Sequence, residues 1–212
     1  MADLLVTEPD YWAIAVGHLK RRDRVLRRII PQHPNVHLTT RGVPFDTLVR
    51  AVVGQQISVK AADAIGQRLF VACEGELTPA RLLQLGIERM RAVGLSQRKT
   101  EYLLDLAAHF ESGRVHPGQW AAMEDEDIIA ELTAIRGIGR WTAEMFLIFN
   151  LRRPNVLPLD DLGLMKAISL HYFSGEPVTR FEAREVAQAW QPWSTVATWY
   201  LWRSLDPVAV EY

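Results

Sequence analysis

The sequence predicts an all-α fold, a two-lobed bundle of about nine or ten helices. Apolar residues recur at the three- and four-residue spacing of a helix through most of the 212 residues. The alternating apolar and polar pattern of a strand is nearly absent. The clearest helical pattern places five side chains on one face: Phe45, Leu48, Val49, Val52 and Val53.

The expected helices follow one another along the chain. The first covers residues 11–30 and carries a run of arginines, which is more typical of a solvated face than of a DNA contact. Prolines interrupt residues 31–44, which form a loop. Ser58 and Ser96 stand where N-cap residues are expected. The other helices are expected at 45–53, 58–69, 79–90, 96–110, as a pair within 126–150, and at 161–173, 180–190 and 194–205.

A short glycine-containing connection, Gly137-Ile138-Gly139, lies between the two helices of the expected pair. Two glycines so close together permit positive φ angles and a close approach of the backbone. The first N–H groups of the second helix have no partner within that helix and could face an anion such as a DNA phosphate. The connection therefore indicates a hairpin that grips a nucleic-acid backbone.

Two adjacent acids, Asp160 and Asp161, stand at the start of a later helix. Aspartate is a favoured N-cap, because it accepts backbone N–H bonds and interacts well with the helix dipole. An acid that follows an anion-gripping hairpin also suggests an enzyme that does chemistry beside a nucleic-acid backbone. Both interpretations can hold, because one acid can cap while the other points into a cleft.

Tryptophans are concentrated in the C-terminal half of the chain. Core packing is the default interpretation for each of them. An aromatic-lined pocket beside an acid would also suit a nucleobase, above all an alkylated base that carries positive charge. The residues in question are Trp141, Trp190, Trp193, Trp199 and Trp202.

Gln55 and Gln56 form a polar break between two apolar helices. In most proteins such a break is only a turn. In a DNA enzyme it could supply the side chain that fills the gap left by an extruded nucleotide.

Composition excludes several classes of protein. The formal net charge of -1 does not by itself indicate a nucleic-acid partner. A local patch of positive charge is still compatible with it, and most basic residues are arginine, which suits phosphate contacts. The single cysteine, Cys73, cannot build a disulfide framework, a tetrathiolate zinc site or an iron–sulfur cluster. Neither a secretory signal nor an apolar span is visible, so we expect a cytoplasmic protein, associated with the nucleoid if bacterial.

Three widespread active-site motifs and a metal site are missing as well. The sequence contains no Walker loop and no nucleophile elbow, and the absence of a strand before Gly137 removes a dinucleotide fingerprint. His33 and His37 share a loop, but no neighbouring carboxylate or thiol completes a metal set.

Taken together, these features resemble the helix-hairpin-helix DNA glycosylases and, more closely, the 3-methyladenine DNA glycosylase II family. The resemblance runs from about Phe45 to Trp202, most of the chain, and implies a single glycosylase domain over residues 1–212 with the hairpin motif at about 126–150. It rests on five blocks in the right order: Val53-Gly-Gln-Gln-Ile-Ser58, Gly94-Leu-Ser-Gln-Arg-Lys99, Ile135-Arg-Gly-Ile-Gly-Arg-Trp-Thr-Ala143, Leu157-Pro-Leu-Asp-Asp161, and Trp190-Gln-Pro-Trp193 with Trp202.

The resemblance implies a role for individual residues. Asp161 matches the catalytic aspartate, which leaves Asp160 as the structural acid, and Gln56 matches the intercalating wedge. The base-pocket positions are Trp141, Met145, Leu162 and Trp202. The implied DNA contacts are Gln55, Gln56, Ser58, Arg136, Gly137, Gly139, Arg140 and Thr142. A monovalent cation, Na⁺ or K⁺, is implied at the backbone carbonyls of Thr133, Ile135 and Ile138.

One position decides the mechanism that the resemblance implies. Bifunctional relatives carry a Schiff-base lysine just after the hairpin, and Trp141 stands there in this chain. The expected protein is therefore a monofunctional hydrolase, without a required cofactor, that releases alkylated purines of the 3-methyladenine and 7-methylguanine type. It would bind duplex DNA as a monomer and rotate the lesion into an active-site cleft between its lobes. The alternatives are a glycosylase for deaminated or etheno bases and a non-catalytic DNA-binding module.

Overall fold

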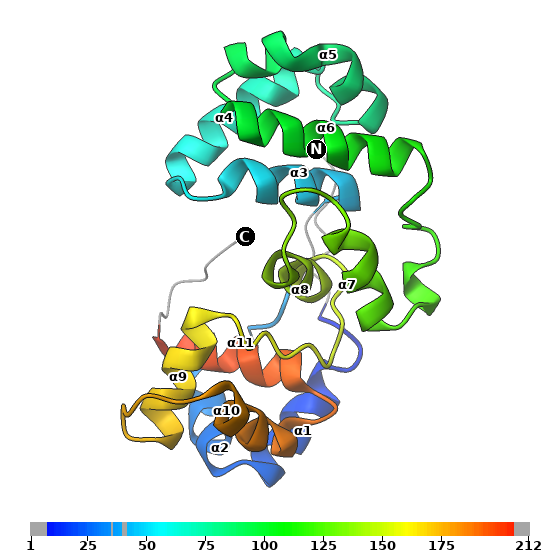
Figure 1. Ribbon diagram of the computed structural model, residues 1–212. Helices are drawn as coiled ribbons and strands as arrows, with labels where there is room; N and C mark the ends of the chain where they lie inside the picture. Colours follow the sequence, from blue (N-terminus) through cyan, green and yellow to red (C-terminus); the bar gives the residue numbers. More distant parts are fainter. Residues whose placement is uncertain (1–7, 35, 40–41, 206–212) are drawn as a thin grey trace. The chain divides into compact units, whose positions relative to one another are not determined.

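A computed structural model describes residues 8–34, 36–39 and 42–205 of the protein. Within these residues there are eleven α-helices and no strand, as the sequence predicts (Figure 1). The helices are α1 Trp12–Arg22, α2 Arg24–Ile29, α3 Pro44–Gly54, α4 Val59–Ala72, α5 Pro79–Ala92, α6 Gln97–Glu111, α7 Asp125–Thr133, α8 Arg140–Phe149, α9 Leu162–Tyr172, α10 Arg180–Ala187 and α11 Ser194–Leu205. Three short 3₁₀ turns cover Ile30–Gln32, Trp120–Ala122 and Gln188–Trp190. No helix in this described part of the chain is long and apolar enough to cross a membrane.

The chain divides into two compact units, which agrees with the expected two lobes. The first unit combines Met1–Thr40 with Leu147–Tyr212, and the second is the continuous segment Arg41–Phe146. Helix α8 therefore begins in the second unit and ends in the first.

The second unit is built around α6. This helix packs against α5 and α3, and α3 packs against α4. The buried apolar face of α3 includes Leu48, Val49 and Val52, as the sequence pattern predicts. Both expected serine caps are present, because Ser58 Oγ accepts from the Ala61 N–H at 3.3 Å and Ser96 Oγ accepts from the Lys99 N–H at 3.2 Å.

The first unit is built around α11. This helix packs against α9, α2 and α1. Trp190 and Trp199 are buried, so core packing is confirmed for these two tryptophans. Trp12 meets Trp199 edge to face, with ring centroids 5.5 Å apart.

The single helix expected over residues 11–30 is wrong, because the chain breaks at Asp23 and forms α1 and α2. Asp23 is extended, with φ -128° and ψ 122°, and its Oδ1 caps α2 by accepting from the N–H groups of Val25 and Leu26 at 2.8 and 2.9 Å. Its Oδ2 accepts from Tyr172 Oη at 2.7 Å and from Trp190 Nε1 at 2.9 Å. Burial, followed by the neighbouring Asp23 carboxylate, raises the pKa of Tyr172, which keeps its hydroxyl a donor.

We expect Asp23→Ala to lower the free energy of unfolding by about 3–5 kcal/mol, because four donors, two of them in fully buried hydrogen bonds, lose their acceptor. Denaturant titration followed by circular dichroism measures the change. Asp10→Ala is the control, since Asp10 is exposed and its loss should cost less than about 0.5 kcal/mol. Equal stability of the two variants would contradict the structural role of Asp23.

Candidate active site and hairpin

The hairpin is the connection between α7 and α8. The Ile138 N–H donates to the Ile135 carbonyl at 3.1 Å and closes the turn. Both isoleucine side chains are buried, so they anchor the turn in the second unit. The Gly139 carbonyl accepts from the Ala143 N–H at 3.0 Å, which starts α8 directly after the turn.

The two glycines of the hairpin differ, although the sequence suggests the same freedom for both. Gly137 has a φ of +85°, and a Cβ there would lie 2.1 Å from Cδ2 of Tyr102 on α6. At Gly139 φ lies outside the left-handed range and a Cβ would meet no atom within 4 Å. Only Gly137 therefore requires glycine, and the close approach that it permits is to Tyr102.

Arg136 is held by acids of α6. Its N–H donates to Asp105 Oδ2 at 2.8 Å, and its guanidinium lies 3.3 Å from Glu101 Oε2. These contacts fasten the hairpin to α6. They also mean that a phosphate would meet a guanidinium already paired with Glu101.

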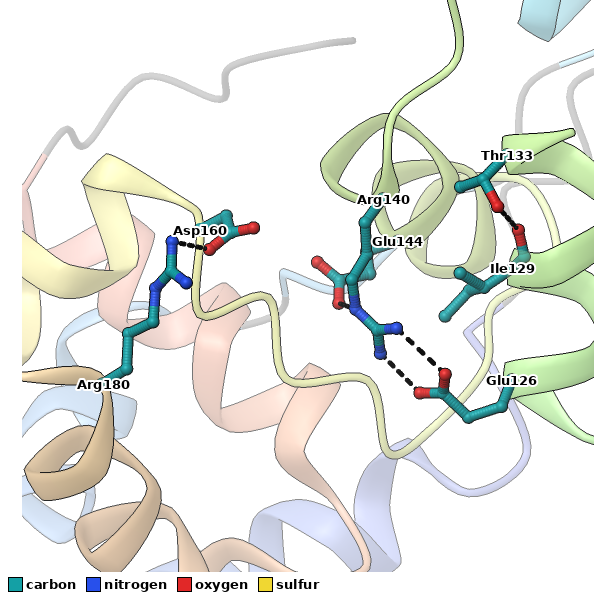
Figure 2. Close-up of polar contacts among 7 residues, drawn as sticks. All are labelled: Glu126, Ile129, Thr133, Arg140, Glu144, Asp160 and Arg180. Carbon is teal, nitrogen blue, oxygen red and sulfur yellow. Dashed lines mark hydrogen bonds and ion pairs between the residues drawn. The ribbon is translucent and has the colours of Figure 1, made fainter. Parts of the chain in front are cut away.

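Arg140, the first residue of α8, is held between two glutamates (Figure 2). Its two terminal nitrogens fork onto the carboxylate of Glu126, with the Nη1–Oε2 bond at 2.9 Å, while Nε donates to Glu144 Oε1 at 3.0 Å. The Glu126 side chain is 70% exposed, whereas that of Glu144 is 5% exposed. The hydrogen bond from Arg140 lowers the pKa of Glu126, so this acid is charged at neutral pH. Glu144 thus fixes the guanidinium, and Glu126 covers it from the solvent side.

The polar break after α3 separates two glutamines with different environments. Gln55 Nε2 donates to the Gly137 carbonyl at 2.8 Å, so this side chain faces the hairpin. Gln56 is exposed and has a φ of +57°. Ser58 is occupied as the N-cap of α4, and Thr142 of α8 is half-buried.

Asp161 is the N-cap of α9. Its Oδ1 accepts from the Leu164 N–H at 2.6 Å and from Trp202 Nε1 at 2.8 Å, and the residue is buried. Asp160 is exposed and pairs with Arg180 at the start of α10 (Figure 2). The expected division, with Asp160 as the structural acid, is therefore wrong on one point: Asp161 makes the cap, because its side chain turns toward the free N–H groups of α9.

Trp202 is oriented by two contacts. Its indole nitrogen bonds Asp161, and its ring stacks on Phe149 with centroids 5.8 Å apart and planes 11° from parallel. A Cβ at Gly163 would lie 3.3 Å from Trp202 Cδ1 and 3.1 Å from Asp161 Oδ1, so glycine permits this contact. Phe149 and Gly163 are not among the site residues that the sequence predicts. A glycine in the first turn of a helix was an available signal for Gly163, but nothing marked Phe149.

The other predicted pocket residues lie in different surroundings. Trp141 and Met145 are four residues apart on α8, so they share a face of that helix within the second unit. Trp141 is half-buried and Met145 is buried. Leu162, the first residue of α9 in the first unit, is 85% exposed.

The hairpin carbonyls suit a hard monovalent cation chemically. The last carbonyls of a helix lack partners within that helix, and Thr133 ends α7. The Ile135 carbonyl already accepts from Ile138 but keeps a second lone pair. The Thr133 hydroxyl donates to the Ile129 carbonyl at 2.7 Å (Figure 2). In the described residues no group of three or more His, Cys, Asp or Glu side chains could hold a metal ion.

A chain whose described residues form helices without strands, with a glycine-containing hairpin and a helix-capping, tryptophan-bonded aspartate, has clear relatives. A family model described as HhH-GPD superfamily base excision DNA repair protein matches residues 49–192, and the chain belongs to this superfamily. Within it, the chain belongs with the 3-methyladenine DNA glycosylases. It is 35% identical over 195 residues to DNA-3-methyladenine glycosylase 1 of Schizosaccharomyces pombe, which covers 88% of this chain and 85% of that relative.

Solved structures give the same result. The DNA-3-methyladenine glycosidase of Bacillus halodurans has a TM-score of 0.86 and 38% identity, over 93% of this chain and 92% of that one. The 3-methyladenine DNA glycosylase of Schizosaccharomyces pombe, in complex with abasic DNA, has a TM-score of 0.76 and 33% identity, over 94% of this chain and 99% of that one. The predicted fold class and family are thereby confirmed.

Proposed function

We propose that this protein is a monofunctional DNA glycosylase that hydrolyses the N-glycosidic bond of alkylated purines in duplex DNA. Membership of the 3-methyladenine DNA glycosylases supports the reaction class. The observation that carries the proposal is Asp161, a buried carboxylate fixed by the first turn of α9 and by the indole of Trp202.

Release of an alkylated purine requires little help from a general acid. Alkylation at N3 or N7 makes the purine cationic, so the base leaves readily once the glycosidic bond stretches. The difficult part is the positive charge that develops on the deoxyribose. A carboxylate fixed beforehand stabilises that charge without reorganising during the reaction, and it can orient or deprotonate the attacking water. Asp161 has this role in the proposal.

Trp202 connects the acid to base recognition. Its bond to Asp161 and its stack on Phe149 fix the plane of the indole. An aromatic face attracts a cationic, alkylated base more strongly than a neutral one. Trp141, Met145 and Leu162 are the further base contacts that the family resemblance implies.

DNA binding is assigned to the second unit. N–H groups at Gly137 and Gly139 would contact phosphates, with Arg136, Arg140, Ser58 and Thr142 beside them, and such contacts carry no sequence information. Gln56 would fill the gap left by the flipped lesion. We further propose that the protein acts as a cytoplasmic monomer, without a required cofactor, with Na⁺ or K⁺ at the hairpin carbonyls.

Incubation with N-methylated duplex DNA tests the function directly. We expect chromatography to detect free 3-methyladenine and 7-methylguanine, with untreated duplex as the control. Release of hypoxanthine or ethenoadenine from matched oligonucleotides, without release of methylated purines, would favour the alternative lesion class. Duplex binding without release of any base would favour the non-catalytic module.

The reaction is expected to stop at the abasic site. Trp141 stands where a Schiff-base lysine would stand, so borohydride should trap little covalent protein–DNA complex. Denaturing electrophoresis of a labelled lesion duplex measures trapping, with a bifunctional glycosylase as the positive control. Efficient trapping that disappears when one lysine is replaced would overturn the monofunctional mechanism.

Glu126→Gln is expected to bind undamaged duplex about two- to fivefold more tightly than the original protein. The substitution frees Arg140 from an exposed ion pair, and such pairs contribute little, so the gain is modest. Asp127→Asn makes the same change of charge one residue away, outside the fork, and serves as the control. Fluorescence anisotropy measures both affinities, and an equal gain in both variants would mean that the fork on Arg140 is irrelevant to DNA.

A further inference from the structure

A side-chain hydrogen bond joins two segments to which the proposed function gives separate tasks. Gln55 Nε2 donates to the Gly137 carbonyl at 2.8 Å, across 82 residues of sequence. Gln55 is the C-cap of α3 and directly precedes Gln56, while Gly137 is the turning point of the hairpin. Both residues belong to the second unit.

Helix α6 contacts both the end of α3 and the hairpin. Lys99 Nζ donates to the Val53 carbonyl, in the last turn of α3, at 2.7 Å. One turn further along α6, the ring of Tyr102 lies against the backbone of Gly137. The end of α3 and the hairpin are therefore both held by α6, and the Gln55 hydrogen bond joins them directly to each other.

Gln56 needs such support. Its φ of +57° lies in the left-handed region that favours glycine, and its side chain is exposed. A non-glycine residue keeps this conformation only when its surroundings determine it. Gln56 is the third residue of a turn that the Ile57 N–H closes on the Gly54 carbonyl at 3.4 Å, and the amide of Gln55, anchored on the hairpin, fixes this turn from outside.

We infer that Gln55 is a positioning residue that holds Gln56 in its left-handed conformation and fixes its place relative to the hairpin. This rests on the proposed function, in which Gln56 enters the stack and the hairpin grips the backbone. The Gly137 carbonyl accepts from Gln55, while the proposed function assigns the N–H groups of Gly137 and Gly139 to the DNA. Seating the hairpin on the phosphates then sets where Gln56 meets the base pairs. Gln55, named from the sequence among the DNA contacts, acts through Gln56 instead.

The test compares two duplexes that differ only in the cost of extrusion. One carries 7-methylguanine opposite cytosine, and the other carries it opposite an abasic site, where the lesion is unpaired. Gln55→Leu removes the donor at similar size, and Gln55→Glu places an acceptor against the carbonyl. We expect each variant to release base from the paired lesion about tenfold more slowly in single turnover, with a much smaller loss on the unpaired lesion.

Two comparisons make the result specific. Gln84→Leu, an exposed glutamine on α5, controls for the change of residue type and should match the original protein on both duplexes. Gln56→Ala should show the same paired-lesion defect as Gln55→Leu, and the double variant should be no slower than Gln56→Ala alone, because Gln55 acts through Gln56.

Several outcomes would overturn the inference. Equal losses on both duplexes, additive losses in the double variant, or loss of the folded state in both Gln55 variants would each remove the positioning role. These failures differ from a failure of the proposed function itself, in which the original protein would release 7-methylguanine from neither duplex.

Discussion

Asp161→Asn is expected to lower the single-turnover rate of base release by about a thousandfold. The asparagine keeps Oδ1 as an acceptor for the Leu164 N–H and Trp202 Nε1, so the cap and the indole contact survive. What disappears is the negative charge that the proposed function places beside the sugar cation. Binding to lesion duplex and the melting temperature should both stay close to those of the original protein, which separates chemistry from folding.

Asp160→Asn is the matched control, because it makes the same change one residue earlier. Asp160 is exposed and pairs with Arg180, and exposed pairs of this kind contribute little to stability. We expect its base release to fall by less than about threefold. Similar rates for the two variants would show that Asp161 is not the catalytic carboxylate.

Gly137→Ala is expected to lower the free energy of unfolding by about 2–4 kcal/mol. The added Cβ would lie 2.1 Å from a ring carbon of Tyr102, and the φ of +85° is unfavourable for alanine. This distance is too short for two carbon atoms, so the hairpin backbone has to move away from the Tyr102 ring. Chemical denaturation measures the loss, and weaker binding to every duplex, damaged or not, should accompany it.

Gly139→Ala is the control for this prediction. Its Cβ would enter open space at an ordinary φ, so the cost should stay below about 1 kcal/mol. Replacing Tyr102 by leucine in the Gly137→Ala protein should recover part of the lost stability. Equal effects of the two glycine substitutions would contradict the contact between Gly137 and Tyr102.

The sequence predicts what depends on local pattern. The fold class and the serine caps at Ser58 and Ser96 follow from short stretches of residues, and the structure confirms them. The break at Asp23 does not follow from any short stretch. Residues 11–30 read as one amphipathic helix, and only the donors of Tyr172 and Trp190, far along the chain, explain why a buried aspartate ends it.

Some residues of the candidate site also follow from local sequence, whereas others depend on contacts between distant segments. The family motifs place Asp161, Trp202 and the hairpin, because each motif is a fixed run of residues. The fork between Arg140 and Glu126 cannot be predicted without the relative placement of α7 and α8. The bond between Gln55 and Gly137 also depends on the placement of α3. These contacts change the interpretation of residues that the motifs had already located.

The division of the chain has a consequence for its synthesis. The second unit is one continuous segment, whereas the first needs both ends of the polypeptide. Asp23 cannot bond Tyr172 or Trp190 until those residues leave the ribosome, so α1 and α2 lack these contacts early in synthesis. The segment Arg41–Phe146 leaves the ribosome before them and can fold first. The unit that holds the hairpin is thus completed before the unit that holds the proposed catalytic carboxylate, and a chain arrested in between would carry the hairpin without Asp161.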